Sequence, residues 1–314
     1  MRFTYSSVVA VLAIFGLLGV YSANAQVTDA EKDLRTQKAD SIGGWKTGGV
    51  TSVNFSQSSF TYWAAGGQNS IGTNMLLSLF ANYEKDRNSW DNLFDFGYGV
   101  LRQGKGEFIK TDDKIDLFSK YGRRASKHWY YSALANFKTQ MSPGYDYPND
   151  SIRISGFLAP AYLLGAVGMD YKPSPNFTAF ISPLTGRLTV VNDQRLADAG
   201  AFGVEPGKNT RGEFGGYARM MYKTTLFSDK SVSVLTKMDL FSNYLKDPGA
   251  VDVSWETILG FKINRFMAAT LTTHLLYDKD VDIAIDKNGD GVPESVGPKV
   301  QFKQVLGIGF TYQF

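Results

Sequence analysis

The sequence predicts an all-β fold, a transmembrane antiparallel β-barrel of about 12 strands with short periplasmic turns and longer extracellular loops. Three observations predict this class. Apolar and polar side chains alternate along many segments that are long enough to cross a bilayer as tilted strands. An export signal opens the chain, and no later stretch is apolar enough for a membrane-spanning helix. Short and long connections alternate between the segments.

The alternation is clearest at the carboxyl terminus, in residues 305–314. Apolar and aromatic side chains fall on one face of an extended strand, and small or polar ones fall on the other. The apolar face comprises Leu306, Ile308, Phe310, Tyr312 and Phe314. A last strand of this kind resembles the closing strand of bacterial outer-membrane barrels. Taken alone, it also fits the last strand of a soluble sandwich.

Residues 1–25 have the three parts of a secretory signal peptide. Arg2 supplies the positive charge, residues 8–20 form the apolar region, and Ala23 and Ala25 flank a small-residue cleavage site. The apolar region is shorter than the roughly 20 residues that a spanning helix needs. We therefore expect a mature chain that starts at Gln26. The chain has no cysteine, which excludes a lipid anchor at the cleavage site, disulfides and thiolate metal sites.

Composition is consistent with this class. The formal charge of the whole chain is only +3, and a nucleic-acid binder would need a concentrated basic patch. Aromatic residues make up 14% of the chain, and it contains 32 glycines. Exported barrels have this profile, but large secreted β-proteins share it. The strand pattern therefore has to separate the two.

The internal segments show the same two-residue period. In residues 90–102, Phe94, Phe96 and Tyr98 lie on one face, with Asp95 and Gly97 on the other. The connections alternate independently of this pattern. Short turns are predicted at 84–88, 122–127, 172–176, 227–230 and 263–266. Longer loops are predicted at 56–69, 103–113, 141–151, 188–212 and 278–299, with a smaller one at 246–250. This arrangement places both termini in the periplasm.

Residues 26–45 differ from the rest because they are polar and highly charged. We interpret them as a periplasmic lead-in segment that precedes a barrel of residues 46–314. A docking peptide for a periplasmic partner is the alternative.

Assigning the apolar faces to lipid leaves a polar lumen. Its main candidates are Asp95, Lys138, Arg219, Lys237, Asp239, Glu256, Lys262 and His274, joined by Asn74, Asn136, Glu213 and Lys223. Two interpretations remain open. The side chains either fill the interior with ion pairs and hydrogen bonds, or they form a constriction that selects small polar solutes. Because both signs of charge are mixed, the sequence predicts no strong ion preference.

Two long loops are unusually apolar. Residues 188–212 and 56–69 contain glycines and aromatic side chains where a solvated loop would be polar. They are expected to pack at the barrel mouth or inside the lumen. Interfacial aromatic residues with turn glycines are the simpler interpretation.

The last long loop matches the start of an acidic calcium-binding loop. Asp286, Asn288 and Asp290 occupy positions one, three and five, Gly291 occupies position six, and Glu294 follows. Gly297 stands where an EF-hand needs its bidentate glutamate, although Asp278, Asp280 and Asp282 could complete a shell. A hairpin tip rich in turn-forming residues is the alternative. No other cofactor is predicted.

The residues do not favour an enzyme. Of the two histidines, His128 is predicted in a turn and His274 in the lumen, where a satisfied hydrogen bond is its default state. No serine is predicted beside a histidine on the lipid face, and no Gly-x-Ser-x-Gly motif occurs.

Several ordered motifs resemble an outer-membrane β-barrel family widespread in the Bacteroidota lineage and catalogued as a domain of unknown function. The motifs occupy residues 63–69, 157–162, 168–173, 182–186 and 200–204, and the resemblance covers about residues 45–314. It implies fold and location in the outer membrane. It implies no catalytic residue, substrate or cofactor.

Two prolines within these motifs predict an irregular wall. Pro183 lies inside a predicted strand, where it removes a ladder donor, and Pro160 lies near the start of the preceding strand. They mark either one distorted patch, such as a lateral opening or a partner contact, or ordinary strand-end prolines.

The sequence therefore predicts an integral protein of the Gram-negative outer membrane, in contact with its lipid. Passage or binding of small solutes through a narrow, porin-like barrel is the leading function. A structural or accessory component of an envelope complex is the alternative, and an outer-membrane hydrolase is the least favoured.

Overall fold

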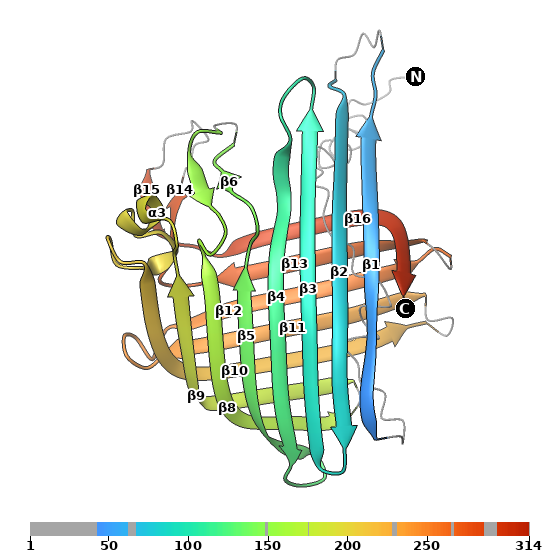
Figure 1. Ribbon diagram of the computed structural model, residues 1–314, viewed down its shortest axis with the longest axis vertical. Coiled ribbons are helices and arrows are strands. Elements are labelled where there is room, and N and C mark those ends of the chain that lie inside the picture. Colours follow the sequence, from blue (N-terminus) through green and yellow to red (C-terminus); the bar gives the residue numbers. More distant parts are fainter. Residues whose placement is uncertain are drawn as a thin grey trace, which may run out of the picture.

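The predicted alternation closes into a ring of antiparallel strands (Figure 1). The computed structural model describes residues 43–61, 67–147, 150–174, 176–227, 231–264, 267–285 and 294–313. The predicted signal peptide and most of residues 26–45 lie outside these ranges and stay predictions. The ring consists of β1 (Gly44–Ser58), β2 (Ser70–Lys85), β3 (Asn88–Gln103), β4 (Ile109–Arg124), β5 (Trp129–Thr139), β8 (Ala161–Ser174), β9 (Phe177–Val190), β10 (Thr210–Leu226), β11 (Val232–Asn243), β12 (Val251–Lys262), β13 (Met267–Tyr277) and β16 (Gln301–Gln313).

The first and last strands close the ring. β1 pairs with β16 through four residues on each strand, from Val50 opposite Gln313 to Val53 opposite Phe310. All other neighbours in the ring follow one another along the chain among the twelve wall strands. Every wall strand therefore has two partners. In Figure 1, β1–β5 run vertically while β11–β13 and β16 cross behind them, because strands in a closed barrel tilt relative to its axis.

The two ends of the barrel differ as predicted. Short turns join β2 to β3, β4 to β5, β8 to β9, β10 to β11 and β12 to β13, and Gly44 and Gln313 lie at this short-turn end. The opposite, long-loop end carries β6 (Gly144–Tyr145), β7 (Arg153–Ser155), α3 (Gln194–Asp198), η1 (Ala201–Gly203), β14 (Asp282–Ile285) and β15 (Ser295–Pro298).

Two loop bounds differ from the prediction. The connection between β3 and β4 is shorter, because β4 begins at Ile109 and not after Asp113. The connection between β5 and β8 is longer and contains the β6–β7 hairpin. α3 is a five-residue helix, and no helix within the described ranges is long and apolar enough to cross a membrane.

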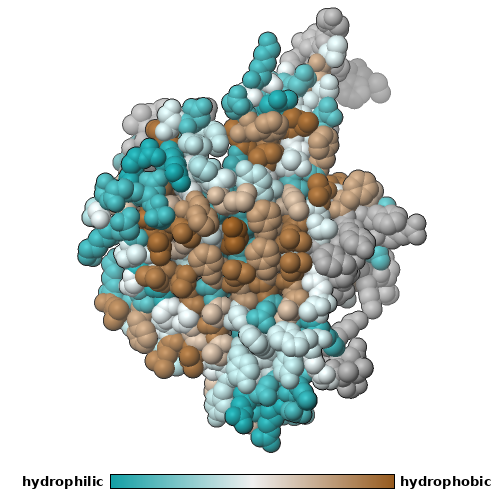
Figure 2. Space-filling view, in the orientation of Figure 1, coloured by the Kyte–Doolittle hydropathy of each residue, from teal (hydrophilic) through white to brown (hydrophobic). Residues whose placement is uncertain are grey.

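The strands separate an apolar outer face from a mixed inner face. In β5, buried Tyr130, Ser132 and Leu134 alternate with exposed Trp129 and Tyr131. Large apolar side chains gather on the outer face, and Figure 2 shows one side of the barrel, where a brown area crosses the middle. They include Val53, Phe55, Met75, Leu117, Leu163, Val167, Ile181, Leu184, Trp255, Phe302, Leu306, Ile308 and Phe310, all exposed.

Aromatic side chains form a girdle near the short-turn end. The ring of Trp45 at the start of β1 lies 5.5 Å from that of Trp90 at the start of β3, and the rings of Trp129 and Tyr171 lie 4.7 Å apart. Trp90 also donates from Nε1 to Ser119 Oγ at 2.9 Å. These aromatic side chains lie at one edge of the apolar area on β1, β3, β5 and β8.

The irregular wall predicted at Pro183 is present. The β8–β9 register shifts between Val167 and Met169, and the β9–β10 register shifts between Gly215 and Tyr217. Ser182 Oγ lies 2.8 Å from the Val167 carbonyl oxygen, so a side chain supplies a donor where the ladder is interrupted. The patch is therefore a bulge in a continuous wall and not a lateral opening. Pro160 directly precedes β8, as an ordinary strand-end proline.

The bulge requires glycine at its partner position. A Cβ atom at Gly168 would lie 2.0 Å from the carbonyl oxygen of Ile181, which is backbone and cannot turn away. We expect Gly168→Ala to destabilise the folded barrel by about 1–3 kcal/mol, measured by heat-dependent electrophoretic mobility and urea unfolding in detergent. Gly186→Ala is the matched control, because its Cβ would meet no atom within 4 Å. Equal stability of the two variants would contradict this account of the bulge.

Candidate functional site

One side of the lumen is filled by apolar side chains. Leu134, Ala166, Phe180, Tyr217 and Phe241 project inward from β5, β8, β9, β10 and β11 and pack into one buried cluster, here called the apolar wedge. Phe118 of β4 packs against it. The Arg219 guanidinium of β10 lies 5.1 Å from the centre of the Phe118 ring, across the three strands that separate β4 from β10. The wedge thus occupies the lumen between β4 and β11.

Four ion pairs lie beside the wedge at mid-height, and together they form the waist of the lumen. Two are tight: the Nη2 of Arg219 lies 3.0 Å from Asp239 Oδ2, and the Nζ of Lys237 lies 2.8 Å from Glu256 Oε2. Two are loose: Lys114 Nζ lies 3.9 Å from Asp95 Oδ2, and Lys138 Nζ lies 3.7 Å from Asp116 Oδ2.

Hydrogen bonds hold the buried carboxylates in place. Ser78 donates to Asp95, Asn136 Nδ2 donates to Asp116 at 2.6 Å, and the Tyr217 hydroxyl donates to Asp239 at 2.6 Å. Because each carboxylate has a second polar partner besides its cation, its burial costs less.

The structure places most of the predicted lumen residues on the inner face. Asp95, Lys138, Arg219, Lys237, Asp239 and Glu256 come together at the waist. Lys262 is different: it is exposed at the short-turn end of β12, away from the waist. Whether these side chains act on a solute stays a prediction.

His274 makes the hydrogen bond expected of it. Its Nε2 lies 2.9 Å from Ser254 Oγ on the neighbouring strand. The register pairs His274 with Glu256, which is bound by Lys237. The sequence predicts no serine beside a histidine on the lipid face, and the structure brings Ser254 and His274 together on the lumen face instead.

A cavity of about 360 Å³ extends inward from the short-turn end. Asp91, Lys120, Tyr130, Asp170 and Lys172 line it, and Asp95, Asp116 and Lys237 of the waist form its inner limit. Lys120 Nζ lies 2.6 Å from Asp170 Oδ2, and Lys172 Nζ lies 3.5 Å from both Asp91 and Asp170. The cavity therefore combines paired charges with aromatic walls.

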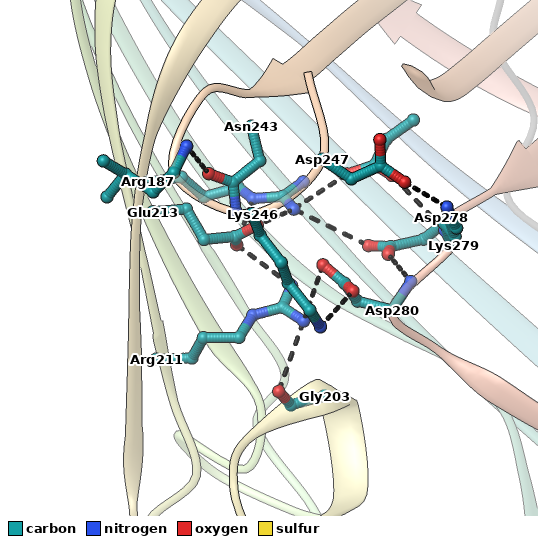
Figure 3. Close-up of polar contacts among 12 residues, drawn as sticks. Arg187, Gly203, Arg211, Glu213, Asn243, Lys246, Asp247, Asp278, Lys279 and Asp280 are labelled. Atoms are coloured by element: carbon teal, nitrogen blue, oxygen red, sulfur yellow. Dashed lines mark hydrogen bonds and ion pairs between the residues drawn. The ribbon is translucent and has the colours of Figure 1, made fainter. Parts of the chain in front are cut away.

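A second set of ion pairs lies at the long-loop end, here called the mouth network (Figure 3). Arg187 donates from Nε to Glu213 at 2.6 Å and from Nη2 to Asp252 at 2.8 Å. Its guanidinium lies 4.2 Å from the centre of the Phe241 ring. Arg187 therefore connects β9, β10 and β12 directly against the wedge.

The mouth network continues into the loops. Arg211 binds Glu213 at 2.9 Å, Asp280 at 3.5 Å and the carbonyl oxygen of Gly203 at 3.3 Å. Lys246 Nζ lies 2.7 Å from Asp280. At the exposed rim, a hydrogen bond from Lys279 lowers the pKa of the Asp247 carboxyl.

The loop that carries α3 packs on this end, as one interpretation of its apolar sequence expected. Val191, Ala197 and Val204 form a buried cluster with Ala159 from the loop before β8. Asp193 caps α3 by accepting from the backbone N–H of Arg195 at 3.1 Å. Of the other apolar loop, residues 62–66 lie outside the described ranges.

The calcium hypothesis is not tested. Asp286, Asn288 and Asp290 lie outside the described residues, and Glu294 is exposed. Among the residues that the structure describes, no group of three or more acidic or histidine side chains could hold a metal ion. Asp278 and Asp280, which could have completed the shell, lie close to Arg187 and Arg211.

Arg187, the centre of the mouth network, is not among the lumen residues that the sequence predicts. Before the bulge at Pro183, the buried residues of β9 are even-numbered, as at Phe180 and Ser182. After it they are odd-numbered, as at Thr185 and Thr189. The bulge adds a residue and reverses the alternation. The proline was the available signal, because a strand proline predicts such a shift of faces.

Comparisons with known proteins found one family and several solved structures. A family described as "Protein of unknown function (DUF3078)" matches residues 55–145. No curated protein matches the chain. The translocator domain of autotransporter NalP from Neisseria meningitidis is similar at 10% identity and a TM-score of 0.37, over 90% of this chain and 92% of that one. The COG4313 outer membrane channel from Pseudomonas putida F1 is similar at 11% identity and a TM-score of 0.40, over 88% of this chain and 97% of that one. OmpT, an outer membrane protein of Vibrio cholerae, is similar at 8% identity and a TM-score of 0.30, over 89% of this chain and 99% of that one. At scores this low, function has to be inferred from the chain's own side chains.

The waist predicts a specific stability effect. Arg219→Met leaves Asp239 inside the lumen without its guanidinium, and we expect a loss of about 3 kcal/mol or more in the free energy of unfolding, measured by urea titration in detergent micelles. Arg219→Met combined with Asp239→Leu removes both charges and should recover part of the loss. Arg195→Met is the control, because that side chain is 73% exposed and should matter little. A double variant no more stable than the single one would contradict a buried-charge cost.

Proposed function

We propose that the protein is an integral outer-membrane barrel that forms a narrow, partly occluded passage for small polar solutes. The division of its lumen is the observation that supports this function most. An apolar wedge fills one side, while the other side is lined by charged and amide side chains. Lys114 and Lys138, which lie next to the wedge on β4 and β5, remain 37% and 39% exposed, which indicates room for water beside them.

The outer face supports a membrane location. Soluble monomers rarely expose contiguous apolar patches larger than a few hundred Å². Here an apolar area crosses the middle of the face seen in Figure 2. Exposed Trp45, Trp90 and Trp129 lie near the short-turn ends of their strands, and membrane barrels carry interfacial aromatic side chains at such positions. Short turns are periplasmic in such barrels, so the cavity at the short-turn end would open to the periplasm.

The polar side supplies a continuous route in this proposal. The periplasmic cavity reaches Asp95, Asp116 and Lys237 at the waist. Lys114 and Lys138 follow on β4 and β5, and Lys303 of β16 projects into the lumen and lies 3.7 Å from Asp112 of β4. Charged and polar side chains along the route compensate for the hydration that a small solute loses.

The wedge and the mouth network favour a narrow passage over a wide pore. Arg219 and Phe118 meet across the lumen at mid-height, and Arg187 bridges β9 and β12 at the long-loop end. Any solute has to pass beside these contacts. Small size is therefore the first selection that the barrel would impose.

A hydrolase is the second candidate, and one observation favours it. Ser254 Oγ and His274 Nε2 lie 2.9 Å apart, within the distance at which histidine activates a serine nucleophile. Detergent-solubilised protein would be incubated with a fluorophosphonate probe, with Ser254→Ala as the control. Labelling that depends on Ser254 would support a hydrolase, and its absence would remove this candidate.

The passage is tested by conductance in planar lipid bilayers. We expect small, discrete openings from the folded barrel, and larger ones from Phe180→Ala, because removing a wedge side chain widens the lumen. The increase should be about twofold or more if the wedge is the obstruction. Phe302→Ala is the matched control, since that ring is 62% exposed on the outer face, and it should leave conductance unchanged.

A folded sample without openings would contradict the passage. A structural or accessory role in the envelope would then be favoured, and co-purification from native membranes would identify the partner.

A further inference from the structure

We propose that the waist prefers small anions, such as carboxylates or phosphate. This inference rests on the proposed function, because it concerns what the passage admits. The waist and the neighbouring Lys303–Asp112 pair contain equal numbers of cations and carboxylates, so their net charge gives no preference. The two signs, however, are not equally accessible to a solute.

Accessibility differs within the loose pairs. Lys114 is 37% exposed while its partner Asp95 is 3% exposed, and Lys138 is 39% exposed while Asp116 is 10% exposed. Lys303 is 53% exposed while Asp112 is 16% exposed. In the tight pairs, both partners are buried to a similar extent: the side chains of Lys237 and Glu256 are 15% and 19% exposed. The accessible charge at this level of the lumen is therefore positive.

Hydrogen bonds explain why the carboxylates are withdrawn. Asp95 accepts from Ser78 on the adjacent strand, and Asp116 accepts from Asn136. These donors hold the carboxylates against the wall. The lysines lie 3.7–3.9 Å from their carboxylates, beyond good hydrogen-bond distance, and their flexible stems can turn toward a solute.

The three exposed lysines lie at one level of the barrel. Lys303 is the direct strand partner of His274 on β13. Lys114 is two residues beyond Asp112 on β4, and Lys138 on β5 is the direct strand partner of Asp116, two residues further along β4. The Lys303–Asp112 pair joins β16 to β4, although β1, β2 and β3 separate these strands in the ring. An anion at this level would therefore meet ammonium groups from opposite walls.

The chemistry favours a small oxyanion. Each ammonium group offers three donors that suit carboxylate or phosphate oxygens. The carboxylates behind the lysines reduce the field, so the preference should be moderate. Cations would meet the same ammonium groups first and would be repelled.

The reversal potential in a KCl gradient tests this inference. We expect the wild-type barrel to favour Cl⁻ over K⁺. Lys114→Gln, Lys138→Gln and Lys303→Gln together should lower the chloride-to-potassium permeability ratio about threefold or more. Lys105→Gln, a neutralisation in the exposed β3–β4 loop, is the matched control and should leave the ratio unchanged. Potassium phosphate and potassium acetate would replace KCl to compare oxyanions.

The outcomes separate the two proposals. A conducting wild-type barrel that favours K⁺, or a triple variant with the ratio of the wild type, would overturn the anion preference and leave the passage intact. A barrel that folds but does not conduct would overturn both. If the triple variant lacks the heat-dependent mobility of a folded barrel, the single variant Lys303→Gln is measured instead. A smaller decrease in its chloride-to-potassium permeability ratio would support the inference, and no decrease would contradict it.

Discussion

Closure of the hydrogen-bonded ring is the constraint on which the rest of this structure depends. A wall of strands in an apolar medium must pair its backbone N–H and C=O groups, and pairing β1 with β16 removes the two edges that an open sheet would leave. Once the ring is closed, alternate side chains must face either outward or into the lumen. The apolar belt and the charged interior are both consequences of that geometry.

The interior then has to accommodate charge away from bulk water. At the waist, Asp95, Asp116 and Asp239 each have a cation and a neutral donor, as Asp239 has Arg219 and Tyr217. Buried ion pairs contribute little net stability, but they are costly to break, so they fix the positions of the strands that carry them. The same arrangement withdraws Asp95 and Asp116 to the wall and leaves Lys114 and Lys138 more exposed than these partners.

Uneven filling distinguishes this lumen from a uniform polar pore. The apolar wedge packs strands β5 to β11 together through their inner faces, as in the core of a soluble protein. The opposite strands carry small and polar inner residues, such as Ser52, Asn54, Asn74 and Ser78, which are buried. One half of the barrel is thus held by apolar packing, and the other by its backbone ladder and polar contacts such as Ser78–Asp95.

The sequence by itself determined the barrel class, the strand count, the alternation of short and long connections and the faces of segments such as residues 90–102, because a two-residue period and turn chemistry are local properties. It also placed Asp95, Arg219, Lys237, Asp239, Glu256 and His274 on the inner face. Only the tertiary structure decided which of them meet, since ion pairs such as Lys303–Asp112 join strands far apart in the ring. It also decided the face of Arg187, because the bulge at Pro183 reverses the alternation that sequence analysis has to assume.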